Sequence, residues 1–156
     1  FSIFYILFVC DMEKFYLPFY LNLSILIIGL SVAYHGNIFH IDTLNILNST
    51  QFKLSFYGFI CGYFILWLIN FIFKLIKKQD GIGGGDFLLL GGIGSLVGPI
   101  SLAPIIFIGS LSTLFIGLIQ RYDLNNQLPL GSGLIIGLFI FLLVKFFELS
   151  FFGFVI

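Results

Sequence analysis

Charged residues are scarce in this chain. They make up 9% of its 156 residues, while 60% of the residues are hydrophobic. A soluble globular domain normally carries about 25% charged residues, so the composition excludes that class. The net charge is zero, and nothing in it indicates a nucleic-acid partner. We therefore predict an all-α membrane protein, with residues 1–156 forming a single membrane-embedded domain.

Clusters of metal-binding residues are also lacking. The two cysteines, Cys10 and Cys61, lie in separate apolar runs and form no CxxC motif. We therefore expect neither a disulfide nor a metal pair between them. The two histidines, His35 and His40, share one long polar segment in which no further ligand accompanies them. We expect these histidines to be solvated instead of bound to a metal ion.

Long apolar runs are what the chain has instead. They predict a polytopic bundle of about six transmembrane helices, whose short joints are typical of an up-down arrangement. A helix of ten residues covers only about 15 Å of a hydrocarbon core about 30 Å thick. We therefore expect the first helix to be truncated and preceded by further sequence. The predicted spans are 1–10 (partial), 17–34, 54–73, 87–98, 102–119 and 130–156.

The distribution of basic residues predicts the orientation of these spans. The joints are the segments between consecutive predicted spans. If the spans alternate in direction, the first, third and fifth joints share one membrane face, and Lys53 lies on the opposite face. The positive-inside rule then makes the first face cytoplasmic. Alternation also places Asp11, which ends the first span, and Asp86, which opens the fourth, at the same depth. The basic residues of the first face are Lys14, Lys74, Lys77, Lys78 and Arg121.

A glycine-rich stretch, GIGGGD at 81–86, precedes the fourth span. Glycine allows positive φ angles and the close approach of another backbone. Irregular backbone at membrane depth requires protein or a water-filled cavity around it, so we predict a hydrated pocket near Asp86. The alternative is a flexible loop in which Asp86 is only the N-cap of the next helix. A phosphate-binding loop is excluded because an acid follows the glycines.

Asp11 and Asp86 are the candidate catalytic pair. Two carboxyl groups that meet in a poorly solvated site cannot both ionise cheaply, so one keeps its proton. The charged member can take a proton from an attacking water, while the protonated member hydrogen-bonds the developing oxyanion. The histidines lie on the opposite face and supply no base for a serine or cysteine nucleophile. The alternatives are a transport subunit in which the acids relay protons or bind a cation, and a structural subunit.

The motifs around the two acids resemble those of the GxGD-type intramembrane aspartyl peptidases, and among them the type IV prepilin peptidases. Residues 83–86 fit the Gly-x-Gly-Asp signature that opens a helix rich in leucine and glycine. Asp11, followed by Pro18 and a leucine-rich run, fits the first acid of the family. Residues 127–133 are similar to the turn that opens the family's last helix. The resemblance covers residues 5–140, and archaeal preflagellin peptidases share these motifs.

This resemblance implies a peptidase that cleaves the basic leader of type IV prepilin or pseudopilin precursors at the cytoplasmic face of the bacterial inner membrane. It implies that the two aspartates are catalytic and that proteolysis requires no metal or cofactor. Gly83, Gly84 and Gly85 would let the substrate backbone approach the second aspartate. Acidic residues on the same face would attract the basic leader, and these are Glu13, Asp80 and Asp123.

The chain departs from the family pattern at two points. Leu88 stands where many relatives carry a lysine, two positions after the second aspartate. The larger bacterial members also carry paired CxxC motifs, which this sequence does not contain. The resemblance to those members implies S-adenosylmethionine as a cofactor if methylation of the new N-terminal residue is retained. We assign no residue to methyl transfer.

Overall fold

The structure is a computed structural model that describes residues 2–14, 17–34, 51–78, 81–119 and 129–152. These residues form six helices and no strand, which confirms the predicted all-α fold. The helices match the predicted spans in order, with differences at their ends: α1 continues four residues beyond the predicted end, so that Asp11 lies inside it, α4 is longer at both ends, and α5 begins two residues before Asp86. They are α1 (Ser2–Lys14), α2 (Phe19–Tyr34), α4 (Gln51–Lys77), α5 (Gly84–Val97), α6 (Leu102–Ile119) and α7 (Leu130–Phe152).

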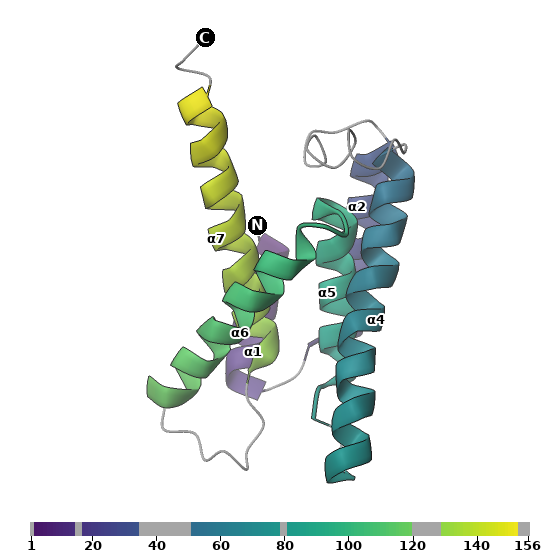
Figure 1. Cartoon of the computed structure of the whole chain (residues 1–156), viewed down its shortest axis with the longest axis vertical. Coiled ribbons are helices and arrows are strands. Elements are labelled where there is room, and N and C mark those ends of the chain that lie inside the picture. The colour runs from purple at the N-terminus through teal and green to yellow at the C-terminus, as the bar shows by residue number, and fades with distance from the viewer. Residues whose placement is uncertain (1, 15–16, 35–50, 79–80, 120–128, 153–156) are drawn as a thin grey trace.

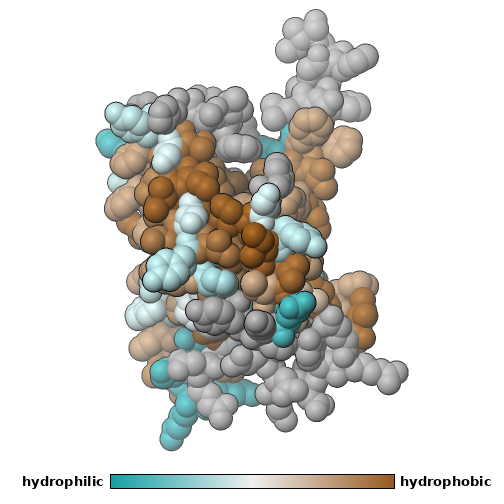
Figure 2. Space-filling view, turned by 180° about the vertical axis from the view of Figure 1, so that it is seen from behind, coloured by the Kyte–Doolittle hydropathy of each residue, from teal (hydrophilic) through white to brown (hydrophobic). Residues whose placement is uncertain are grey.

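Three of these helices are long and apolar enough to cross a membrane, and the chain is an integral membrane protein. The other apolar helices, α2 and α5, are shorter. Figure 2 shows hydrophobic side chains across the middle of one face of the molecule, with hydrophilic residues toward its lower end. The three long spans are Phe52–Lys77, Leu102–Ile119 and Leu130–Phe147.

The helices pack in two groups (Figure 1). In the first, which we call the α5 group, α2 and α4 both pack on α5. In the second, the α7 group, α1 and α6 both pack on α7. Contacts between the groups are fewer and join α5 to α6 and α7, and α1 to α2. Asp11 belongs to the α7 group and Asp86 to the α5 group, so their separation depends on how the two groups meet.

Glycines let the helix backbones touch within each group. A Cβ atom added to Gly58 of α4 would collide with the carbonyl oxygen of Gly94 in α5, and the reverse is also true. In the α7 group, a Cβ atom added to Gly137 would lie 2.6 Å from the carbonyl oxygen of Ile105 in α6. Small residues are typical of helix contacts in membranes, because burial of apolar side chains against protein gains little over burial against lipid.

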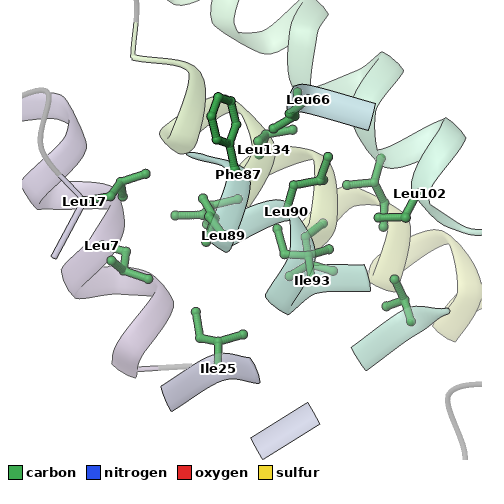
Figure 3. Close-up of a cluster of buried hydrophobic side chains, with 14 residues drawn as sticks. Leu7, Leu17, Ile25, Leu66, Phe87, Leu89, Leu90, Ile93, Leu102 and Leu134 are labelled. Carbon is green, nitrogen blue, oxygen red and sulfur yellow. The ribbon is translucent and has the colours of Figure 1, made fainter. Parts of the chain in front are cut away.

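A cluster of buried hydrophobic side chains joins the two groups at α5. Leu89, Leu90 and Ile93 of α5 lie near its centre and are fully buried. Figure 3 shows Leu7 of α1 on one side of them and Leu102 of α6 on the other. This packing holds the first turn of α5 against the α7 group. As a result, the end of α1 and the beginnings of α5 and α7 lie at the same end of the molecule (Figure 1).

Candidate active site

Asp11 lies in the last turns of α1, with only 4% of its surface exposed. Its Oδ2 atom accepts a hydrogen bond from the main-chain N–H of Ser132. Ser132 is the third residue of α7, and N–H groups in the first turn of a helix have no partner within the helix. They also carry the positive end of the helix dipole, which favours a nearby carboxylate. The start of α7 therefore orients the Asp11 carboxyl group.

Asp86 is the third residue of α5 and is 8% exposed. The N-cap of this helix is Gly83, which has no side chain to cap it, and the Asp86 main-chain N–H donates to the Gly83 carbonyl oxygen at 3.1 Å. The alternative in which Asp86 is the N-cap is therefore wrong. Within the described part of the chain, the Asp86 Oδ1 atom is buried and has no hydrogen-bond partner. Such an atom in a native structure requires an explanation.

The two carboxyl groups meet at Gly131, the second residue of α7. A Cβ atom added there would lie 3.0 Å from Asp86 Oδ1 and 3.2 Å from Asp11 Cγ. These two atoms are therefore separated by no more than about 6 Å. The structure thus brings together two acids that are far apart in the sequence and belong to different helix groups. Whether they are catalytic stays a prediction.

The turn before α7 borders the site, together with α1, which carries Asp11, and α5, which carries Asp86. Pro129 is fully buried, and Ser132 Oγ donates a hydrogen bond to its carbonyl oxygen at 2.8 Å. Both Gly131 and Ser132 are buried. The family resemblance includes this turn but assigns neither Gly131 nor Ser132 to the site. The sequence signal for them is the run of small residues, Gly131–Gly133, two positions after a proline at the start of an apolar helix.

The three predicted substrate-binding glycines have different surroundings. Gly83 and Gly84 are exposed, and a Cβ atom added to Gly84 would lie within 4 Å of no described residue beyond its chain neighbours and its own helix backbone. A Cβ atom added to Gly85 would lie 2.7 Å from Leu17 Cβ, so the absence of a side chain there allows the chain to pack on itself. Approach of a substrate backbone to these glycines stays a prediction.

The other predicted residues lie farther from the pair or outside the described residues. Glu13 is exposed in the last turn of α1. Leu88, at the position of the family lysine, is half-buried. Cys10 and Cys61 are half-buried and not joined in a disulfide. Four predicted residues lie outside the described residues, namely His35, His40, Asp80 and Asp123.

Two asparagines to which the sequence analysis assigns no role, Asn22 and Asn70, contact the glycine segment. Asn22 of α2 donates a hydrogen bond to the carbonyl oxygen of Gly85. Asn70 of α4 accepts hydrogen bonds from the main-chain N–H groups of Gly81 and Ile82. The sequence signal was an amide side chain within an otherwise apolar helix, but nothing in the sequence indicates which backbone it meets.

Comparison with known proteins identifies relatives of this chain. The profile of the type IV leader peptidase family matches residues 1–118. The chain is 30% identical over 131 residues to a prepilin leader peptidase/N-methyltransferase of Burkholderia pseudomallei (strain 1026b), covering 81% of this chain and 39% of that protein. Proteins with the same name in Neisseria gonorrhoeae and Aeromonas hydrophila are 29% identical over 124 residues and 30% identical over 137 residues.

The last two alignments cover 80% and 85% of this chain, and 40% and 43% of the relatives. The chain therefore spans about two fifths of the length of the curated relatives it matches. No solved structure matches it.

Proposed function

The chain belongs to the type IV leader peptidase family, and we propose that it is a membrane aspartyl endopeptidase that removes the basic leader of type IV prepilin-like precursors. The observation that carries this proposal is the meeting of Asp11 and Asp86 at Gly131. Both acids come from the region that the family profile covers. Buried carboxyl groups are costly unless they are paired or perform chemistry, so their proximity supports a catalytic role.

The pair can catalyse hydrolysis of a peptide bond without a nucleophilic side chain. Repulsion and burial disfavour two charges at this separation, so the pair retains one proton. The ionised member removes a proton from water as the water attacks the scissile carbonyl carbon. The protonated member donates a hydrogen bond to the developing oxyanion, and its proton then passes to the leaving amine. Two observations support this use of the site: the buried Asp86 Oδ1 atom has no hydrogen-bond partner among the described residues, and Gly131 has no side chain.

We propose that cleavage takes place at the cytoplasmic face of the bacterial inner membrane. The basic residues at the end of α4, including Lys74 and Lys77, lie at the same end of the molecule as the site (Figure 1). Basic residues are enriched on the cytoplasmic side of membrane proteins. The exposed Glu13 lies one turn or less from Asp11 and is suited to attract a basic leader. The proposed substrates are prepilin and pseudopilin precursors, which the relatives' names support.

We propose no cofactor for this reaction and no methyl-transfer step. The relatives' names include N-methyltransferase, which would require a methyl donor such as S-adenosylmethionine. Among the described residues, the two buried side-chain polar atoms without a hydrogen-bond partner belong to Asn22 and Asp86. Both residues adjoin the glycine segment of the proposed proteolytic site. They therefore do not indicate a separate site for a methyl donor.

The proposal is tested by replacing each aspartate with asparagine and incubating the protein, in membranes, with a pilin precursor. Asp11→Asn and Asp86→Asn are each expected to reduce formation of the shortened product by about 10²–10⁴-fold, the usual contribution of a general acid or base. Mass spectrometry of the product and the amount of inserted protein are the measurements.

Glu13→Gln provides the matched control, because it makes the same chemical change two residues from Asp11. It is expected to leave kcat near the wild-type value and to raise KM for a basic leader. Normal processing by either aspartate variant would contradict the assignment. Ion flux across the membrane without any cleavage product would favour a transport subunit instead.

A further inference from the structure

We propose that Asn22 and Asn70 are positioning residues that hold residues 81–86 from two sides and thereby place the Asp86 carboxyl group at Gly131. Asn22 comes from α2 and Asn70 from α4, the two helices that pack on α5. The structural part of this proposal stands on the hydrogen bonds alone. Its consequence for catalysis rests on the proposed function.

Asn22 fixes the residue that precedes Asp86. Its side chain is fully buried, and Nδ2 donates a hydrogen bond to the Gly85 carbonyl oxygen at 3.0 Å. Its Oδ1 atom is buried without a partner among the described residues. An amide buried in an apolar helix costs free energy, and this one satisfies only part of its hydrogen-bonding capacity. If position 22 served only the stability of α2, an apolar residue there would be more stabilising than asparagine.

Asn70 fixes the other end of the segment. Its Oδ1 atom accepts hydrogen bonds from the N–H of Gly81 at 2.9 Å and from the N–H of Ile82 at 3.1 Å. These two residues precede α5 and belong to no helix, so their N–H groups need a partner outside regular structure. A Cβ atom added to Gly81 would lie 2.6 Å from the ring of Phe73, so the segment also packs closely on α4.

The glycine content of the segment explains why such anchors are needed. Glycine loses more conformational freedom on folding than any other residue. Gly83 and Gly84 have no side chains to pack and are exposed, so they add little that would fix the backbone. The hydrogen bonds to the main chain at Gly81, Ile82 and Gly85 therefore add to the packing of Gly81 on Phe73 and of Gly85 on Leu17 in restraining the segment. Through these bonds α2 and α4 help to place Asp86, whereas the start of α7 orients Asp11.

The two asparagines have opposite hydrogen-bonding roles. Replacement by aspartate is therefore expected to have different effects at the two positions. Asn22 acts as a donor, so Asn22→Asp removes the hydrogen bond and places a carboxylate against a carbonyl oxygen. Asn70 acts as an acceptor, so Asn70→Asp keeps the oxygen that receives both N–H groups. The exposed Lys74, one turn later on α4, favours a charge at position 70. Asn70→Leu removes the acceptor.

The experiment measures kcat and KM for a pilin precursor, together with deuterium uptake by the peptide that contains residues 81–86, in the full chain. Asn22→Asp and Asn70→Leu are each expected to lower kcat by about tenfold to a hundredfold, the usual result of a small displacement of a catalytic group. KM should stay within about twofold of the wild-type value, because substrate contacts are not removed. Deuterium uptake at 81–86 should rise in both variants.

Two further variants serve as controls. Asn70→Asp is expected to retain wild-type kcat and deuterium uptake, and this rescue separates the hydrogen bonds from a general effect of changing position 70. Ser24→Ala removes a hydroxyl group on the same helix as Asn22, but this hydroxyl donates its hydrogen bond to the carbonyl oxygen of Tyr20 in its own helix. It is expected to change neither readout. If Asn22→Asp fails to accumulate, Asn22→Leu removes the same donor without burying a charge and is expected to give the same loss.

Loss of kcat in Asn70→Asp equal to that in Asn70→Leu would overturn the proposal, as would wild-type kcat in both Asn22 variants. If the wild-type chain cleaves no precursor, the proposed function fails and deuterium uptake alone decides the structural claim. Increased deuterium uptake at residues 81–86 in Asn22→Asp and Asn70→Leu, with unchanged uptake in Asn70→Asp, supports the claim that the two asparagines hold this segment. Unchanged deuterium uptake in all three variants overturns that claim.

Discussion

Glycine has different neighbours at two of the interfaces that α5 makes, those with α4 and with the α7 group. At the interface with α4, a Cβ atom on Gly58 would meet the main-chain carbonyl of Gly94. At the interface with the α7 group, a Cβ atom on Gly131 would meet the ends of three side chains, those of Leu17, Asp86 and Asp11. Backbone atoms cannot move aside without shifting a helix, whereas the ends of side chains can turn away.

This difference teaches that the same residue type serves stability at one interface and chemistry at the other. Within the α5 group, glycine allows two backbones to touch, and any side chain there pushes two helices apart. Between the groups, glycine keeps space free beside two carboxyl groups. An added side chain should therefore cost stability at Gly58 and activity at Gly131.

Gly131→Val should have the largest effect on activity. The added side chain would occupy the space where the two carboxyl groups meet, and we expect kcat to fall by about a hundredfold or more. The amount of folded protein should stay near the wild-type level, because the three atoms nearest to the added Cβ belong to the side chains of Leu17, Asp86 and Asp11 and not to the backbone. Cleavage at the wild-type rate would show that the carboxyl groups do not act together at this position.

Gly58→Ala should show the opposite behaviour. The new methyl group collides with the Gly94 carbonyl oxygen, and overpacking of this kind typically destabilises a protein by about 1–3 kcal/mol. The measurement is the free energy of unfolding in detergent, with kcat determined per folded molecule. Unchanged stability together with reduced kcat would remove the distinction between the two interfaces.

Ser132→Ala should have a smaller effect. The hydrogen bond to Asp11 comes from the main-chain N–H, which alanine retains. The lost bond joins the Ser132 hydroxyl to the Pro129 carbonyl oxygen, and we expect destabilisation of about 1 kcal/mol. The Ser132 hydroxyl also lies within hydrogen-bonding reach of Asp11, but alanine keeps the main-chain N–H that orients this carboxyl group, so cleavage assays should give a much smaller loss of kcat than Asp11→Asn does. A large loss of kcat would show that the hydroxyl group itself takes part.

Gly84→Ala should change stability least, by less than about 0.5 kcal/mol. Among the described residues, no atom lies within 4 Å of the added methyl group apart from those of its chain neighbours and its own helix backbone. The same variant tests the predicted approach of substrate, because a methyl group in the path of the peptide would raise KM. If even Gly84→Val leaves both KM and the unfolding free energy unchanged, substrate does not approach this glycine.

The helices were predictable because each depends on a local property of the sequence. Long apolar runs predicted all six helices, and the two aspartates could be found because an ionisable group beside such a run is costly. The start of α5 was predicted less well. Under the N-cap alternative Asp86 would precede the helix, but Gly84 and Gly85 are helical and Asp86 is the third residue. Packing of Gly85 against Leu17 and its bond to Asn22 outweigh the low helix propensity of glycine.

The sequence by itself therefore determined the membrane class, the six helices that the described residues form, the family motifs and the two acids, since these follow from composition and spacing along the chain. Only the tertiary structure decided that Gly131 lies between the acids, that the Ser132 N–H orients one of them, and that Asn22 and Asn70 hold the segment before the other. The physical reason is that hydrogen bonds and close contacts depend on distances of a few ångströms between helices. Apolar periodicity does not specify which atoms will meet across those distances.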